Sequence, residues 1–445
     1  MKTAAGTWRN WAGSATAVPA RWCRPASVAQ ISAEVKAAAA GGLTVRALGS
    51  GHSFTDTAAC PGGVVLDLSA WTGLASCDAA TGIVTVRSGT TVRELNRLLD
   101  ATGLAMANLG DIDVQTIAGA LSTGTHGTGA TLGGLATQIT AMELVLADGS
   151  VVSCSASERP ELFAAARVGL GALGVVTTVT LRCVPAFTLA ADERPMPLDE
   201  VLATFGTMAA ENDFCEFYWF PYGRKALVKR NNRVPSSDRP MPAWRRLWEY
   251  EVMENAAFGA MCRTGRRFPG LIPRLNAVSS SVLSARSYTD VSHRVFVTPR
   301  RVRFVESEYA VPRESLPDVL SELRSAVPRL PFPVMFPVEV RVAAADDIWL
   351  STAYGRDSAY IAIHQYQGLP YQEYFDVFES VVASASGRPH WGKMHSLTAP
   401  RLRELYPKFD DFLAVRSAHD PGGLFVNPYL ERVLGVSASP PGDRQ

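Results

Sequence analysis

The spacing of apolar residues predicts a helix and then a strand near the N-terminus. Ser27 precedes the segment VAQISAEVKAAAA, in which valine and isoleucine recur at helical spacing, and Gly41 and Gly42 follow it. The apolar stretch at residues 43–48 then predicts a strand. A capped helix is therefore expected to lead through a strand into the glycine-rich segment that begins at Gly49.

Similar patterns predict further helix and two small sheets in the rest of residues 1–184. Apolar and β-branched runs predict strands, and Asp148-Gly149-Ser150 between two such runs is typical of a hairpin. The strands are predicted at residues 63–68, 83–87, 139–147 and 151–154, and a helix at residues 93–103.

The pattern changes after Pro185. Prolines interrupt the chain more often, and aromatic clusters such as FCEFYWFPY at residues 214–222 appear. These prolines and aromatic clusters predict a second domain, residues 185–395, built on a broad antiparallel sheet. Residues 406–434 are expected to return to compact mixed structure. The predicted fold class is α+β, with two domains.

Length and composition are those of a compact protein with two cores. The chain has 445 residues, of which 47% are hydrophobic and 19% are charged. Lys and Arg number 43 against 42 Asp and Glu, which gives a net charge of +1. Such a balance creates no global field that would attract nucleic acid, so we expect no nucleic-acid partner.

The cysteines and the N-terminal residues favour a cytoplasmic location. Seven cysteines are scattered without a CxxC pair, which fits a reducing compartment and predicts no metal centre. The opening MKTAAGTWRNWAG lacks the apolar core of a signal peptide, and no uncharged run has the composition of a membrane span. Stable membrane insertion is not expected, whereas loose docking to a respiratory partner at a membrane stays compatible with the sequence.

The segment RALGSGHSFTD, residues 46–56, carries a glycine-rich turn around one histidine. Gly49 and Gly51 tolerate positive φ and leave their N–H groups unblocked, so the turn can close around a phosphate. His52 then lies where a dinucleotide would bind. The third glycine of a nicotinamide-binding Rossmann turn is missing, which disfavours a nicotinamide cofactor.

A second segment rich in small residues points to the same ligand. Residues 115–134, QTIAGALSTGTHGTGATLGG, have Gly, Ala, Ser or Thr at most positions and no charged side chain. The segment has too little bulk for a core helix and too few prolines for a linker. We expect its backbone to wrap tightly around a flat ligand.

Four motifs together resemble one flavoprotein family. RALGSGHS, GALSTGTHGTG, LGALGVVTTVTL at residues 170–181 and HWGK at residues 390–393 are similar to the sugar-lactone and alditol oxidase group of the vanillyl-alcohol-oxidase flavoproteins. The resemblance runs from about Trp8 to Leu434. It implies a PCMH-type FAD-binding domain at residues 1–184, a substrate-binding cap domain at residues 185–395 whose sheet is flanked by helices, and a C-terminal segment at residues 396–445 that packs back on the FAD domain.

The resemblance also implies FAD bound covalently, because the histidine of the GSGHS loop bonds to the flavin in this family and His52 occupies that position. Such a bond retains the cofactor and makes it a stronger oxidant. The cofactor-binding residues implied are Ala47, Leu48, Gly49, Ser50, Gly51, His52, Ser53, Asp111, Thr116, Gly119, Ser122, Thr123, Gly124, His126, Gly127, Val175, Val176 and Lys393.

The strand PVEVRV, residues 337–342, is predicted to supply substrate clamps. Its three valines point one way, so Glu339 and Arg341 share the opposite face. A carboxylate and a guanidinium at this spacing can bind adjacent hydroxyls of a polyol or lactone. A structural ion pair would show the same pattern, but the resemblance implies that this pair contacts substrate and flavin.

The strand YIAIHQY, residues 360–366, places His364 and Tyr366 on one surface by alternation. The resemblance implies a histidine beside the reacting carbon, so His364 is the candidate general base, working with Arg341. Alditol oxidases have a threonine where this chain has Tyr366. We expect Tyr366 to narrow the substrate pocket and to favour a cyclic lactone over an open-chain polyol.

Two further positions are assigned through the resemblance. Lys393 is expected near the flavin N1/C2 carbonyl region, where its charge would stabilise the anionic flavin. Asp111, where alditol oxidases have serine, can accept hydrogen bonds from substrate hydroxyls. The adjacent Gly110 implies a path for O2, while the similarity to lactone dehydrogenases implies another redox acceptor.

Other histidine chemistry is disfavoured. A hydrolase built on Ser53, His52 and Asp56 is disfavoured, because adjacent residues in a tight turn cannot present the geometry of a catalytic relay. The remaining histidines are predicted to be satisfied loop or surface residues without metal-ligand spacing: His293, His390, His395 and His419.

The resulting hypothesis is FAD-dependent oxidation of an L-gulono-, L-galactono- or D-arabinono-1,4-lactone by hydride transfer to flavin N5, with O2 or another acceptor taking the electrons. The alternatives are an alditol oxidase acting on xylitol or sorbitol, a flavin oxidoreductase of specialised metabolism acting on a larger alcohol, and a flavin-binding protein without turnover.

Overall fold

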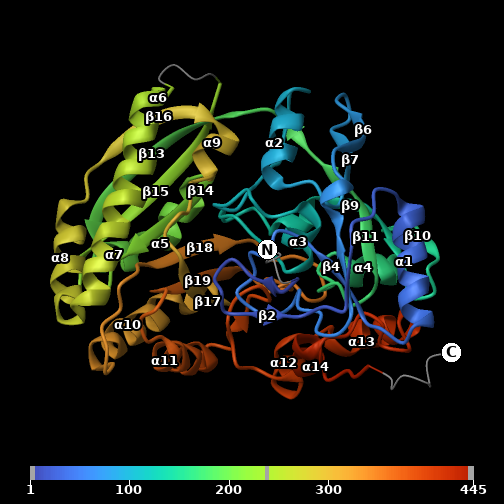
Figure 1. The fold of residues 1–445 in the computed structure, drawn as a ribbon. Coiled ribbons are helices and arrows are strands. Elements are labelled where there is room, and N and C mark those ends of the chain that lie inside the picture. The colour runs from blue at the N-terminus through green and yellow to red at the C-terminus, as the bar shows by residue number, and fades with distance from the viewer. Residues whose placement is uncertain (1–5, 236–239, 439–445) are drawn as a thin grey trace.

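The computed structural model describes residues 6–235 and 240–438 and has two lobes (Figure 1). One lobe contains the N-terminal strands and two small sheets, and the other is built on one large sheet. The C-terminal helices lie beneath the N-terminal lobe, next to its core. The expected α+β fold with an antiparallel sheet in the second domain is confirmed.

Two sheets organise the N-terminal lobe, as predicted. A three-stranded parallel sheet has the order β3-β5-β4, and a five-stranded antiparallel sheet has the order β10-β9-β11-β7-β6. Two-stranded ribbons β1-β2 and β12-β8 complete it. The elements are β1 (Trp8–Arg9), β2 (Thr16–Ala17), β3 (Arg21–Cys23), α1 (Val28–Ala40), β4 (Val45–Leu48), β5 (Val64–Asp67), η1 (Leu68–Ala70), β6 (Leu74–Asp78), β7 (Ile83–Arg87), α2 (Val92–Asp100), β8 (Leu104–Ala105), α3 (Ile117–Ser122), η2 (Leu135–Gln138), β9 (Ile139–Val145), β10 (Val151–Ser155), α4 (Pro160–Ala166), β11 (Val175–Arg182) and β12 (Val184–Pro185).

Local chemistry accounts for the elements that the sequence predicted. Ser27 caps α1 by accepting a hydrogen bond from the Gln30 amide, and the buried side of the helix is its apolar stripe. The hairpin between β9 and β10 turns at Gly149, whose φ of 75° is a conformation that glycine adopts without strain.

The second lobe is an eight-stranded antiparallel sheet with the order β16-β13-β15-β14-β18-β19-β17-β20. The helices flank it on both sides. Its elements are β13 (Thr188–Pro197), α5 (Leu198–Glu211), β14 (Phe214–Trp219), β15 (Lys225–Val234), α6 (Ala243–Arg246), η3 (Leu247–Ala257), α7 (Phe258–Arg267), η4 (Pro269–Leu271), α8 (Ile272–Val282), β16 (Arg286–Val291), α9 (Ser292–Phe296), β17 (Phe304–Pro312), η5 (Arg313–Ser315), α10 (Leu316–Ala326), η6 (Val327–Arg329), β18 (Val338–Ala343), β19 (Ser358–Tyr366), α11 (Gln372–Ser384) and β20 (Arg388–Pro389).

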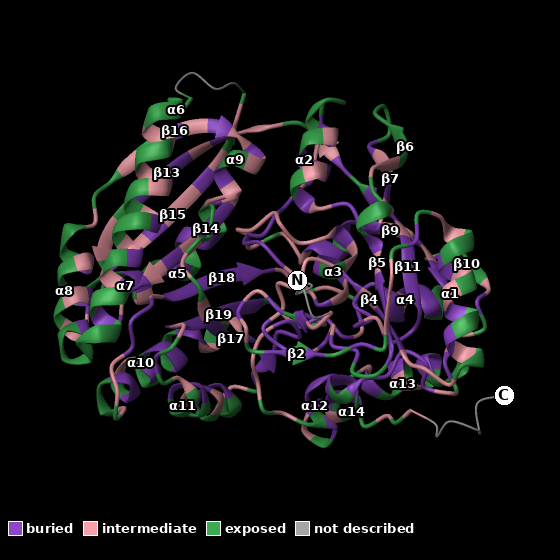
Figure 2. Cartoon of the chain, in the orientation of Figure 1, coloured by how far each residue is buried: buried purple, intermediate pink, exposed green. Residues whose placement is uncertain are grey.

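The two faces of this sheet differ in chemistry. The valines of β18 and the isoleucines of β19 pack with α5, α10 and α11 in one apolar core. The opposite face carries buried acidic and basic side chains, among them Glu306, Glu339 and Arg341. Figure 2 shows the strands of this sheet buried between the lobes and the outer helices. The polar face therefore lies toward the N-terminal lobe.

The C-terminal segment is helical, which corrects the expectation of mixed structure. Residues 406–434 contain helices and turns and no strand. Their buried side chains belong to the same apolar core as those of α2, α3 and α4, and α13 contacts α4 directly. The helices are α12 (Ala399–Leu405), α13 (Phe409–His419) and α14 (Pro428–Leu434). No helix in the described ranges is long and apolar enough to cross a membrane.

The small-residue segment divides into two parts. Its first half forms α3, which packs Ile117 and Leu121 into the core. Its second half turns to the large sheet, where the Gly129 amide donates to the Val342 carbonyl and Thr128 donates to the Cys215 carbonyl. The expectation that the whole segment wraps a ligand is therefore wrong for this second half, whose backbone docks the two lobes.

Arg46 on β4 ties three separate segments together. Its guanidinium is buried and donates to the carbonyls of Thr57, Leu170, Gly171 and Phe425 at 2.5 to 2.9 Å. Burial lowers its pKa to about 10, so the side chain keeps its charge at neutral pH.

We expect Arg46→Met to lower the free energy of unfolding by about 3 kcal/mol, because four buried carbonyls lose a charged donor. Urea denaturation measures the change. Arg24→Met is the control, since Arg24 is exposed and bonds only to the Ser69 hydroxyl within the described ranges, and it should cost less than about 0.5 kcal/mol. Equal losses in the two variants would contradict the role of Arg46.

Candidate active site

A groove crosses the N-terminal lobe between β4, α3 and the turn before β11. Its lining includes residues 46–53 and parts of the segments 115–123 and 170–176. The loop after β4 approaches α3 so closely that a Cβ on Gly49 would lie 2.4 Å from the Thr116 hydroxyl oxygen. A side chain at this position would displace the cap of α3, because Thr116 accepts the Gly119 amide.

The groove offers unused polar groups that suit a dinucleotide. No amide of residues 50–53 donates to a backbone carbonyl in the described part of the chain. Trp8 Nε1, Ser88 Oγ and Gln115 Oε1 are buried in the groove wall without a hydrogen-bond partner there. Because buried polar atoms are almost always paired, these atoms indicate a polar ligand, and FAD fits the donor set and the glycine-lined wall.

His52 lies where the groove meets a second cavity, since it lines both. Its ring stacks on Trp11 with centroids 5.4 Å apart. Burial and the positive charge of Lys393 lower the pKa of His52 to about 4. The imidazole is therefore neutral at physiological pH, with an unprotonated nitrogen.

The second cavity has a volume of about 320 Å³ and lies between the lobes. The loop 111–115 supplies one wall, and β14, β17, β18 and β19 supply the other. Its size suits a small molecule, and its walls hold an unusual density of charged side chains.

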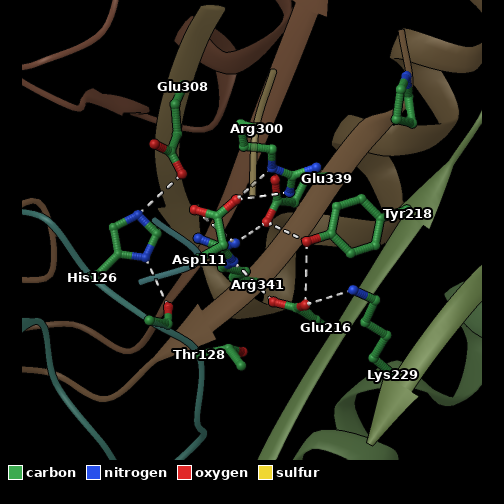
Figure 3. A network of polar contacts seen from close by, with 12 residues as sticks. Asp111, His126, Thr128, Glu216, Tyr218, Lys229, Arg300, Glu308, Glu339 and Arg341 are labelled. Carbon is green, nitrogen blue, oxygen red and sulfur yellow. Dashed lines mark hydrogen bonds and ion pairs between the residues drawn. The ribbon is translucent and has the colours of Figure 1, made fainter. Parts of the chain in front are cut away.

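Glu339 and Arg341 form an ion pair on β18 at the centre of this cavity (Figure 3). Both are buried, on the face opposite the valines, so the predicted alternation is confirmed. Tyr218 on the neighbouring β14 donates to Glu339 at 2.9 Å, and Arg341 Nε donates to Glu216 at 3.0 Å. β14 pairs with β18 and thereby brings these groups together.

Asp111 reaches the same cluster from the N-terminal lobe. Its carboxylate lies 2.8 Å from Arg300 and 3.6 Å from Arg341. Burial would raise the pKa of Asp111, but the two guanidiniums outweigh it and hold the pKa well below its usual range. Asp111 therefore stays ionised, and it links the two lobes across the cavity.

His364 on β19 is oriented by its neighbours. Its Nδ1 donates to the Pro337 carbonyl at 3.0 Å, which leaves Nε2 toward the cavity and 3.4 Å from Glu306. Burial would lower the pKa of His364, but the Glu306 carboxylate outweighs this effect and raises it. Lys393 Nζ lies 2.5 Å from the same Glu306. The Glu306 carboxylate therefore contacts both the Lys393 ammonium and the His364 imidazole.

A second group of polar side chains consists of Glu308 and His390, which line the cavity, and His126 behind them. His126 donates from one nitrogen to the Gly127 carbonyl and bonds Glu308 through Nε2 at 3.0 Å. His390 is buried beside them in the loop after β20, where its Nδ1 accepts the Gly392 amide at 3.0 Å and burial lowers its pKa to about 3. It is a hydrogen-bonded loop residue and does not lie at the surface. His126, Glu308 and His390 hold ligand atoms within 4.8 Å of one another, but both nitrogens of His126 already bond to protein oxygens, and we assign no metal.

Most predicted site residues line the groove or the cavity. Glu339, Arg341, His364, Lys393 and Asp111 line the cavity. Gly124, His126, Gly127 and Val175 line neither. The predicted residues in the groove wall are Ala47, Leu48, Gly49, Ser50, Gly51, His52, Ser53, Thr116, Gly119, Ser122, Thr123 and Val176.

Tyr366 differs from its expected position. Its ring stacks on Phe336 with centroids 6.3 Å apart, and Phe336 forms the cavity wall. Tyr366 is not part of that wall, so it does not narrow the cavity directly. Arg266 covers the outer side of its ring.

Five functional-site side chains were not predicted from the sequence. Alternation within FCEFYW and within FVESEYAVP places polar residues on one face of β14 and β17, and this signal could have identified four of them. Arg300 lies outside a strand and has no such signal. The missed residues are Glu216, Tyr218, Arg300, Glu306 and Glu308.

Comparison with known proteins agrees with this geometry. Residues 19–155 match the FAD binding domain family. The L-gulono-1,4-lactone dehydrogenase of Mycobacterium tuberculosis H37Rv is 44% identical over 96% of this chain and 99% of its own length. The bovine L-gulonolactone oxidase is 34% identical, and the alditol oxidase of a Streptomyces species is 33% identical; each aligns with 96% of this chain and 98% of its own length.

Solved structures show the same fold. The crystal structure of cholesterol oxidase from B. sterolicum superposes with a TM-score of 0.83 over 96% of each chain, at 18% identity. Residues 179–433, more than half of the sequence, match the family model described as D-arabinono-1,4-lactone oxidase. The chain therefore belongs to the D-arabinono-1,4-lactone oxidase family.

Proposed function

We propose that this protein is an FAD-dependent oxidoreductase that oxidises a C–OH group of a sugar-derived 1,4-lactone. The observation that carries the proposal is the junction at His52, where a groove with unused amides meets a cavity lined by ion pairs. FAD, when bound, supplies the two-electron acceptor that takes a hydride from the substrate carbon. The names of the relatives support a lactone as the substrate.

We further propose that FAD is attached covalently through His52. The depressed pKa leaves this imidazole with a free nitrogen lone pair at neutral pH, which a nucleophile needs. The loop around His52 is fixed on both sides, because the Trp11 amide donates to the Gly51 carbonyl and the Phe54 amide donates to the Gly392 carbonyl.

In the proposed mechanism, Glu339 and Arg341 orient the substrate. The Glu339 carboxylate accepts a hydrogen bond from one hydroxyl, and the Arg341 guanidinium donates to a neighbouring oxygen. Both side chains are held by Tyr218 and Glu216, so little side-chain entropy is lost on binding. The ionised Asp111 adds an acceptor from the other lobe.

His364 takes the hydroxyl proton on Nε2 as the C–H bond breaks. Its Nδ1 already carries a proton for the Pro337 carbonyl, so the product is an imidazolium that lies against the Glu306 carboxylate. Lys393 keeps a positive charge beside this pair, where it can stabilise negative charge that develops during oxidation.

The open alternatives concern substrate and acceptor. An alditol such as xylitol would use the same clamp, and O2 or another acceptor can receive the electrons. The seven cysteines are free, which supports a reducing cytoplasm as the proposed location.

Anaerobic mixing tests the proposed substrate class. Addition of L-gulono-1,4-lactone should bleach the oxidised-flavin absorbance of the holoenzyme, and xylitol should bleach it more slowly at equal concentration. Faster bleaching by xylitol would favour the alditol alternative. Absence of bleaching by lactones and alditols would contradict the proposed function.

His52→Ala should release the flavin. After acid precipitation, the unmodified protein is expected to carry yellow colour in the pellet, and the variant is expected to leave it in the supernatant. His419→Ala is the control, because His419 lies on α13 and, among the residues that the structure describes, bonds only the Val415 carbonyl. A yellow pellet from His52→Ala would rule out this attachment.

Glu339→Gln should slow flavin reduction by the lactone by about 100-fold, because the clamp loses the charge that pairs with Arg341. Anaerobic stopped-flow absorbance measures the rate. Glu322→Gln, an exposed glutamate on α10, should leave the rate unchanged. If both variants react at the rate of the unmodified protein, Glu339 is a structural ion-pair residue only.

The rate of flavin reduction should rise with pH through the raised pKa of His364, because only the neutral imidazole accepts a proton. Glu306→Gln removes the carboxylate that raises this pKa, so the acidic limb should move to lower pH by about one unit. Glu308→Gln is the control, because Glu308 bonds His126 and not His364. An unmoved limb in Glu306→Gln would exclude His364 as the base that Glu306 controls.

A further inference from the structure

A helical arm at residues 243–282 forms the outer edge of the second lobe, where α6, α7 and α8 lie far from the N-terminal lobe (Figure 1). α6, η3 and α7 follow one another without a break over residues 243–267. η4 then turns the chain into α8, beside α7. The outer sides of these helices are largely exposed (Figure 2).

The arm concentrates exposed apolar side chains. Of the eleven large apolar side chains exposed in the described part of the chain, nine belong to the arm, and the other two are scattered. Trp244 is 71% exposed and Trp248 is 55% exposed. These indoles form a shallow surface pocket with Leu247 and Val252. The others are Met253, Phe268, Leu271, Val278 and Val282.

The inner side of the same helices is held against the rest of the lobe by polar contacts along η3 and by apolar packing of Cys262 on α7 and Ile272 on α8. Glu249 and Glu254 pair with Arg286 on β16, and the Asn255 side chain donates to the Pro299 carbonyl. Tyr250 meets Tyr288 with their hydroxyl oxygens 3.1 Å apart. These contacts fix the orientation of the arm, so its apolar side faces outward as part of the fold. An outward apolar face of this kind marks an interaction surface.

The charge of the arm favours an anionic partner. It contains six arginines and three glutamates, and all three glutamates are paired with arginines. Arg263, Arg266, Arg267 and Arg274 are exposed. None of these four has a carboxylate within ion-pair distance among the described residues. These four arginines lie on α7 and α8, where Arg267 stacks over the exposed ring of Phe268. The positive excess therefore belongs to the same arm as the exposed apolar side chains, in a chain whose overall charge is only +1.

We propose that this arm binds the surface of an anionic phospholipid bilayer, with Trp244 and Trp248 in the headgroup region and the arginines against lipid phosphates. Indole rings favour this interface because one side is apolar and the N–H can hydrogen-bond. An apolar helix face next to basic side chains is the pattern of helices that lie in the membrane surface. A second copy of the arm is a poorer partner, because a symmetric contact would bring the two sets of unpaired arginines together.

The arm also adjoins the cavity. Phe258 on α7 packs against Phe336 in the cavity wall with ring centroids 4.9 Å apart, and Glu251 pairs with Arg301 at the cavity rim. Docking would therefore hold one rim of the cavity near the lipid surface. The docking itself does not depend on the chemistry proposed for that cavity.

Vesicle sedimentation tests the proposal with the holoenzyme. The protein should sediment with phosphatidylcholine vesicles that contain about 30% phosphatidylglycerol and should stay in solution with phosphatidylcholine alone. Added salt should weaken binding. The double variant Trp244→Ser, Trp248→Ser should bind the vesicles with about one tenth of the affinity of the unmodified protein or with lower affinity, because two interfacial anchors are lost. Its rate of flavin reduction should be unchanged, which shows that it folds.

Matched controls separate the arm from general surface effects. Val18→Ser with Val151→Ser removes two exposed apolar side chains elsewhere and should leave vesicle binding intact. Arg263→Gln with Arg267→Gln should weaken binding, whereas Arg182→Gln with Arg329→Gln, two exposed arginines outside the arm, should not.

Three results would overturn the proposal. The first is failure of the unmodified protein to sediment with either vesicle. The second is vesicle binding by the tryptophan variant that is as tight as that of the unmodified protein. In the third, light scattering without vesicles would show a dimer that the tryptophan substitutions convert to a monomer, which would assign the arm to a second copy of this chain.

Discussion

The structure depends on the compensation of a buried guanidinium. Arg341 lies in the interior between the lobes, where an unpaired charge would cost several kcal/mol. Glu339, Glu216 and Asp111 surround it from β18, β14 and the loop after β8. Because Asp111 belongs to the other lobe, the ion pairs form completely only when the two lobes are docked. The charge of Arg341 is therefore fully compensated only in the docked arrangement that also forms the cavity.

The same docking brings the cofactor groove to the cavity. The carbonyl contacts of Arg46 hold the groove walls and the C-terminal segment together, and the Gly129 amide joins the N-terminal lobe to β18. His52 lies at the meeting point with a neutral ring, while Lys393 and His364 share Glu306 a short distance away. A hydride acceptor in the groove and a proton acceptor in the cavity thus face the same space.

The sequence predicted the features that follow from the spacing of residues close together in the chain. Alternation in PVEVRV placed Glu339 and Arg341 on one face, and the glycines of RALGSGHS identified the loop around His52. It did not predict Glu216 or Tyr218, because their role follows from the pairing of β14 with β18, which are far apart in the chain. Tyr366 was assigned to the pocket from alternation and from the threonine that alditol oxidases have at this position, whereas Phe336 from another segment fills the intervening space.

The central claim is that one FAD occupies the groove with its isoalloxazine end at His52. Peptide mass mapping of the purified holoenzyme tests this placement most directly. After cleavage with trypsin, the peptide of residues 47–87 should carry the mass of the flavin, and fragmentation should locate it on His52. A flavin found on another residue, or an unmodified peptide with flavin free in solution, would contradict the account.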